Sequence, residues 1–160
     1  MKRLTVLLFT LITTIIFLTC SVNGDHPEKE ETPERTSLTL SKKLQRLLSA
    51  EMNSVQHGMT NLSIAIPAGD WSSIAETAKL IKDGYIMEKK LSNQEMKEFQ
   101  NSLPSGYSRI DQQYKKFAMG MIDAAKKEDA KAVNTSFYRL NSTCIECHVK
   151  YAKERFPGFK

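Results

Sequence analysis

Apolar residues recur at intervals of three or four over four stretches of the chain, and this spacing places them on one face of a helix. The stretches run from Leu44 to Ile66, from Ile74 to Tyr85, from Ile110 to Ala125 and from Val133 to Tyr151. Beyond the first 19 residues, no segment alternates between apolar and polar positions as a half-buried strand does. The pattern therefore predicts an all-α protein.

Residues that start and stop helices stand at the ends of these stretches. Pro67 and Gly69 end the first helix, and Asp70 is a suitable N-cap for the second. Asp129 caps the fourth helix, which closes at Pro157-Gly158. Four amphipathic helices joined by links of different lengths predict an antiparallel up-down-up-down four-helix bundle.

The link between the second and third helices interrupts the helical pattern with Asn93, Pro104 and Gly106. Ser92 and Glu95 have the spacing of a capping box, in which each side chain pairs with the backbone of the other residue. We therefore expect one short extra turn in this link.

A basic start and an apolar run occupy the beginning of the chain. Met1-Lys2-Arg3 precedes an uncharged run from Leu4 to Leu18, which is shorter than the about 20 apolar residues of a membrane span. This pattern predicts an export signal over residues 1–19, with a retained anchor as the alternative. Cys20 is a candidate for lipid attachment, although the preceding Phe-Leu-Thr departs from the lipobox. Ordinary signal cleavage after Gly24 would instead remove residues 1–24 and Cys20 with them.

Residues 20–38 are predicted to be a flexible acidic spacer, because Asp25 to Arg35 holds two prolines, five acids and no large apolar residue. Residues 39–160 then form the folded domain. The chain has 23 basic and 18 acidic residues, and loss of Lys2 and Arg3 lowers its formal charge from +5 to +3. This excess is scattered rather than gathered among aromatic residues, so no nucleic-acid partner is expected.

The motif Cys144-Ile145-Glu146-Cys147-His148 carries specific chemistry, because Cys-x-x-Cys-His is the attachment signature of haem c. On a helix these two cysteines and the histidine fall at about 0°, 300° and 40°, within an arc of about 100°. Both thiols can then form thioether bonds to the porphyrin edge while the imidazole reaches the iron. We therefore expect one covalently bound haem c.

Three other roles fit the cysteine pair less well. A thioredoxin-like dithiol needs a βαβ setting, and no strand is predicted. A structural zinc site needs four ligands, whereas His26 and His57 fall in the spacer and the first helix, apart from the motif. A disulfide between Cys144 and Cys147 would be strained within a helix. Export, the helical context and the adjacent His148 all favour haem.

With this motif on its last helix, the chain resembles the class II c-type cytochromes, or cytochrome c-prime family, whose members are exported four-helix bundles. The resemblance covers about residues 40–159. The stretch from Glu51-Met52 to Gly69-Asp70-Trp71 is similar to the first helix and turn of the low-spin, methionine-ligated members. Leu48 stands where many high-spin members have an arginine near the haem propionates, so the resemblance does not identify the residues that contact the propionates here.

The resemblance implies a methionine as the sixth iron ligand. Six methionines follow the export segment: Met52, Met59, Met87, Met96, Met119 and Met121. The helical period places Met87 and Met119 off the inward faces and Met96 in the link. His57 falls on the outer face of the first helix, so it is not expected to bind iron. Any of the remaining methionines could instead fill the core.

Depth along the bundle separates the remaining three methionines in part. At 1.5 Å per residue, His148 lies about 12 Å before the end of its helix, while Met52 and Met59 lie about 20 Å and 30 Å into theirs. Met59 is thus too deep, whereas Met121 has a depth similar to that of Met52. The low-spin members carry their methionine at nearly the distance that separates Met52 from Gly69, so the resemblance implies Met52.

A His148/Met52 pair would keep the iron six-coordinate, which suits one-electron transfer. The resemblance therefore implies an exported electron carrier. A turnover enzyme is not expected, because the sequence offers no acid–base or nucleophile constellation. The alternative is high-spin binding of nitric oxide or carbon monoxide. The expected location is the periplasm, with membrane tethering only through a lipid on Cys20. The expected partners are redox proteins. The high-spin members of the family often form dimers, so the resemblance also implies a homodimer as one oligomeric state.

Overall fold

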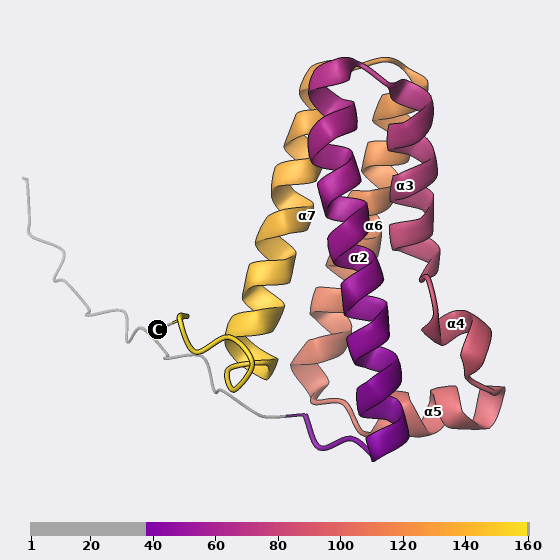
Figure 1. Ribbon diagram of the computed structural model, residues 1–160, viewed down its shortest axis with the longest axis vertical. Helices are drawn as coiled ribbons and strands as arrows, with labels where there is room; N and C mark the ends of the chain where they lie inside the picture. The colour runs from indigo at the N-terminus through magenta and orange to yellow at the C-terminus, as the bar shows by residue number, and fades with distance from the viewer. Residues whose placement is uncertain (1–37, 160) are drawn as a thin grey trace, which may run out of the picture. The chain divides into compact units, whose positions relative to one another are not determined.

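The computed structural model describes residues 38–159, and helices dominate this range (Figure 1). The helices are α2 (Lys42–Ala68), α3 (Trp71–Asp83), α4 (Met87–Lys90), α5 (Asn93–Asn101), α6 (Ser105–Lys126) and α7 (Ala130–Tyr151). The described range has no strand, so the predicted all-α class is confirmed. The predicted export segment, Cys20 and most of the acidic spacer lie outside the described residues. Within residues 38–159, no helix is both long and apolar enough to cross a membrane.

The turn between α2 and α3 forms largely as predicted. Gly69 adopts a left-handed backbone with a φ of 66°, which glycine tolerates without a Cβ clash. Asp70 accepts the backbone N–H of Ser73 at 3.0 Å and thereby caps α3. Pro67 lies inside the last turn of α2, so the helix ends one residue after the proline, at Ala68.

The buried face of α2 is rotated from the predicted one. Its buried residues are Glu51, Val55, Gly58, Leu62 and Ala65. A Cβ at Gly58 would lie 2.4 Å from the hydroxyl oxygen of Tyr85, so the missing side chain allows Tyr85, two residues after the end of α3, to approach α2 closely. As a result, Met52 and Met59 flank the buried face, and 37% of Met52 is exposed.

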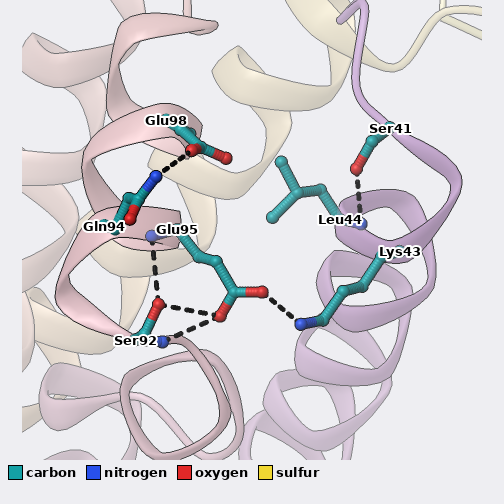
Figure 2. Close-up of polar contacts among 7 residues, drawn as sticks. All are labelled: Ser41, Lys43, Leu44, Ser92, Gln94, Glu95 and Glu98. Atoms are coloured by element: carbon teal, nitrogen blue, oxygen red, sulfur yellow. Dashed lines mark hydrogen bonds and ion pairs between the residues drawn. The ribbon is translucent and has the colours of Figure 1, made fainter.

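The predicted capping box is present, but it starts a helix of nine residues rather than a single turn. Figure 2 shows the Ser92 side chain accepting the amide hydrogen of Glu95, while the Glu95 carboxylate accepts the amide hydrogen of Ser92. The same carboxylate forms an ion pair with Lys43 (Figure 2). This contact joins α5 to the first turn of α2.

The short helix α4 was not predicted, and it changes the position of Met87. The chain turns at Gly84, whose φ of 81° is accessible chiefly to glycine, so the inward face of α3 does not continue into α4. Met87 is buried and packs in a second apolar cluster with Leu40 and Phe99. The prediction that Met87 points away from the interior is therefore wrong.

α7 ends earlier than predicted, because the chain leaves the helix at Ala152, well before Pro157. His148 consequently lies about 5 Å from the end of its helix, rather than about 12 Å. Met52 lies about 15 Å into α2, rather than about 20 Å. Both residues lie nearer to the ends of their helices than predicted, and the difference between the two depths changes only from about 8 Å to about 10 Å.

The main core lies among the four long helices, which run side by side in Figure 1. α6 packs against both α3 and α7, and α2 packs chiefly against α3 while touching α7 at few points. The largest fully buried side chains are Leu62, Ile74, Ile81, Met121, Val133 and Leu140. The predicted inward orientation of Met121 is thus confirmed, and this residue is part of the core.

Candidate functional site

Cys144, Cys147 and His148 lie on the last two turns of α7, where the helical repeat puts them on one side. Both thiols are free and partly buried. Burial raises the pKa of Cys144 to about 11, and burial together with the nearby Cys144 raises the pKa of Cys147 to about 12. Both sulfurs therefore carry their protons at neutral pH.

The imidazole of His148 is stacked on the ring of Phe156, with 4.3 Å between the ring centroids and an interplanar angle of 16°. Phe156 lies in the turns after α7, and no helical pattern signals this contact. Burial lowers the pKa of His148, and the positive charge of Arg155 lowers it further. A neutral imidazole keeps one nitrogen lone pair available for a metal ion.

A cavity of about 500 Å³ opens between α2 and α6, and we call it the α2–α6 cavity. Its wall includes Leu48, Glu51, Met52 and Val55 from α2, and it continues over the end of α3, α5 and α6. Within residues 38–159, no residue of α7 belongs to this wall. The structure therefore places Met52 in the cavity and the cysteine–histidine motif outside its wall.

Three methionines line the α2–α6 cavity: Met52, Met87 and Met96. The sequence analysis set Met87 aside by its helical period and Met96 by its place in the link, but both residues, on the two short helices, line the cavity. Met59 packs against the main core and Met121 is fully buried there, and neither is a wall residue. Met52 thus remains a candidate ligand, and its competitors are Met87 and Met96 rather than Met121.

Two tyrosines of α6 connect the cavity with the cysteines. Tyr107 and Tyr114 both line the cavity wall. Burial, and then the proximity of Cys147, raises the pKa of Tyr107 far above its ordinary value. Burial, and then the proximity of Cys144, does the same to the pKa of Tyr114. Each of these tyrosines therefore lies at the cavity wall and near one cysteine of the motif.

The hydroxyl of Tyr114 is buried, and it has no hydrogen-bond partner among the described residues. A buried hydroxyl without a partner costs about 1–3 kcal/mol, so this state is unfavourable in an otherwise complete core. A group that brought an acceptor atom into the cavity would satisfy the hydroxyl. Tyr114 is therefore a polar contact that the cavity offers to an occupant.

The outward side of the motif is attached to α6. The carboxylate of Glu146 accepts hydrogen bonds from Arg109 at 2.7 Å and from Lys150 at 3.3 Å. These partly exposed ion pairs contribute at most about 1 kcal/mol each, so they orient α7 more than they stabilise it. Ile145 is 43% exposed beside them. The motif thus presents one side to the interior and the other to solvent.

His57 is exposed on α2, so its predicted place on the outer face of this helix is confirmed. Across residues 38–159, no three His, Cys, Asp or Glu side chains gather in a way that could hold a metal ion. Sequence reasoning did not identify Glu51, because the backbone amides that bind its carboxylate are distant from it in the sequence. No known protein family, curated protein or solved structure matches the chain.

Proposed function

We propose that this chain is an exported c-type cytochrome that carries one electron through a single haem c. The haem is held by thioether bonds to Cys144 and Cys147, with His148 and Met52 as axial ligands. The observation that carries the proposal is the Cys-x-x-Cys-His motif on one side of α7, ending in a histidine whose pKa is lowered by burial. Bound haem would supply an iron centre that cycles between two oxidation states.

The proposed architecture is an antiparallel up-down-up-down four-helix bundle of α2, α3, α6 and α7. Support comes from the packing of α6 against α3 and α7 and of α2 against α3. The turn at Gly69-Asp70 and the link of residues 127–129 are both very short, which favours antiparallel neighbours. Among the neighbouring helix pairs of this bundle, α2 and α7 are in the sparsest contact.

The side chains present fit this cofactor in their chemistry. Cys144 and Cys147 are reduced thiols, which is the form that adds to the vinyl groups of haem. Phe156 holds the plane of the His148 ring, so little side-chain entropy remains to be lost when the imidazole binds iron. Met52 presents its thioether at the cavity wall, and the unpaired Tyr114 hydroxyl is available as a donor.

A gas-binding haem protein is the second candidate, and two observations favour it. Met52 is 37% exposed and does not share a cavity wall with His148, so the sulfur would have to move to reach the iron. The Tyr114 hydroxyl could also donate a hydrogen bond to a small bound ligand such as nitric oxide.

Haem staining of a denaturing gel tests the proposal. The protein should be produced in a bacterial host that attaches haem c in the periplasm, alongside a Cys144→Ser/Cys147→Ser variant. We expect the wild-type band to retain the stain after boiling and the variant band to lose it. A wild-type band without stain, at normal expression, would rule out a c-type cytochrome.

A further inference from the structure

Glu51 is a buried carboxylate that binds three consecutive backbone amides. Only 7% of the residue is exposed. Its Oε1 accepts the N–H of Tyr85 at 2.7 Å, and its Oε2 accepts the N–H groups of Ile86 at 2.6 Å and Met87 at 2.9 Å. These bonds join α2 to the segment between α3 and α4, which is 34 residues distant from Glu51 in sequence at its nearest point.

Glycine at position 84 makes this arrangement possible. Gly84 has a φ of 81°, and it turns the chain so that the next three amides face α2. A Cβ on Gly84 would lie 3.7 Å from Oε1 of Glu51 and 3.1 Å from Cγ of Glu88, so the space for a side chain is narrow. The conformation and the crowding both favour glycine.

The charge of Glu51 is balanced by amide dipoles rather than by a cation. A buried carboxylate is costly unless strong hydrogen bonds compensate it, and charge-assisted bonds to N–H groups are of this strong kind. None of the ion pairs found in residues 38–159 includes Glu51. The two lysines of the cavity wall, Lys82 and Lys115, are paired with Asp83 and Asp111.

Glu51 therefore places a fixed negative charge at the wall of the α2–α6 cavity, immediately before Met52. The reach of this charge is visible in the tyrosines of the same region. Burial is the main cause of the raised pKa of Tyr85, and the charge of Glu51 is the second cause. For Tyr107 and Tyr114, burial and other neighbouring groups raise the pKa more than the charge of Glu51, which also contributes. Tyr107 and Tyr114 line the cavity, so a charge that acts on these two phenols acts within the cavity as well.

From these contacts we infer that Glu51 is a positioning residue of the haem site, which fastens the Tyr85–Met87 segment to α2 beside Met52 and favours the oxidised cofactor by its charge. The inference rests on the proposed haem function. Iron carries one more positive charge when oxidised, so a fixed nearby negative charge stabilises that state and lowers the reduction potential.

The reduction potential of the holoprotein separates a charge effect from a purely structural one. Glu51→Gln removes the charge, and the potential should rise. Glu51→Asp keeps the charge on a shorter side chain, and the potential should stay near the wild-type value. Glu88→Gln is the matched control, because Glu88 is an exposed acid of the same cavity wall, and it should shift the potential less. Equal shifts in Glu51→Gln and Glu88→Gln, or equal shifts in Glu51→Gln and Glu51→Asp, would overturn the inference.

Hydrogen exchange tests the fastening role without a redox readout. In the wild-type protein, the amides of Tyr85, Ile86 and Met87 should exchange slowly although they precede or begin the short α4 helix. Glu51→Gln should accelerate their exchange by about tenfold or more, since charge-assisted hydrogen bonds are lost. Fast exchange of all three amides in the wild-type protein would overturn the inference while leaving covalent haem in place. Absence of covalent haem with slow exchange would instead defeat the haem proposal and the redox role with it.

Discussion

Three methionines at the α2–α6 cavity are candidates for the proposed sixth iron ligand, and their thioethers are chemically identical. Met52 differs from Met87 and Met96 in its position on the long helix α2 and in its greater exposure. A thioether that binds iron opposite histidine raises the reduction potential and occupies the site that a gas would use. A single substitution at each residue therefore decides both the ligand and the function.

Met52→Ala should convert a low-spin ferric protein to a high-spin one, accelerate carbon monoxide binding to the ferrous form and lower the reduction potential. Met87→Ala and Met96→Ala, at the same cavity, should keep the low-spin spectrum. Met121→Ala should cost about 2–5 kcal/mol of stability through its core cavity without changing the spin state. Optical spectra of both redox states measure the outcome. A wild-type protein that is already high-spin and binds carbon monoxide quickly would support the gas-binding candidate instead.

The buried thiols should make the haem-free protein sensitive to alkaline pH. Folding raises the pKa of Cys144 from its ordinary 9.0 to about 11, so the folded state holds this proton more tightly than the unfolded state. The resulting stabilisation is complete below pH 9 and is lost as the pH rises toward 11. At pH 8, alkylation of Cys144 should be about 100-fold slower in the folded chain than in urea. Rates that match in the two states would show that the thiol is not buried.

At the scale of single elements, periodicity and capping residues predicted the long helices well. Asp70 and Asp129 cap α3 and α7 as expected, because an N-cap depends on a few neighbouring residues. α4 was missed because four residues are too few to show a period. The early end of α7 was missed because the nearest stop signal in the sequence is Pro157, whereas Phe156 folds back on His148 before it.

The rotation of α2 had a different cause. A pattern based on hydropathy selects Met52 and Met59, but the packed face needs small residues such as Gly58 where α3 approaches. It also contains Glu51, which is buried because distant backbone amides bind it. Neither the close approach of two helices nor a hydrogen bond between residues distant in sequence changes the period of apolar residues along the chain. The shared side of the motif residues on α7 could be predicted because it depends only on local spacing, and their haem chemistry stays a prediction.

Two residues of α2 test the placement of its buried face, which includes Leu62 as the sequence predicted. Leu62 is fully buried, whereas Ile64 on the same helix is 66% exposed. Leu62→Ala should lower the free energy of unfolding by about 2–5 kcal/mol, because it leaves a core cavity. Ile64→Ala should change it by no more than about 0.5 kcal/mol. Urea unfolding of the two variants measures the difference, and similar losses would contradict the placement of α2.

At the scale of the whole molecule, the proposal joins a helical domain to an export segment that lies outside the described residues. The lipid on Cys20 remains a prediction with a direct test. If Cys20 is lipidated, the exported protein should partition into detergent, and Cys20→Ala should release it to the soluble fraction. N-terminal sequencing that begins at Asp25 would show ordinary signal cleavage instead.

Covalent attachment of haem is the claim on which the account depends, and the mass of one peptide tests it most directly. The exported protein should be digested with trypsin, and the peptide containing Cys144 to His148 should be identified by fragmentation. We expect that peptide to carry the mass of one haem, with both cysteines blocked to alkylation. A peptide of unmodified mass, with two cysteines that alkylate after unfolding, would contradict the account.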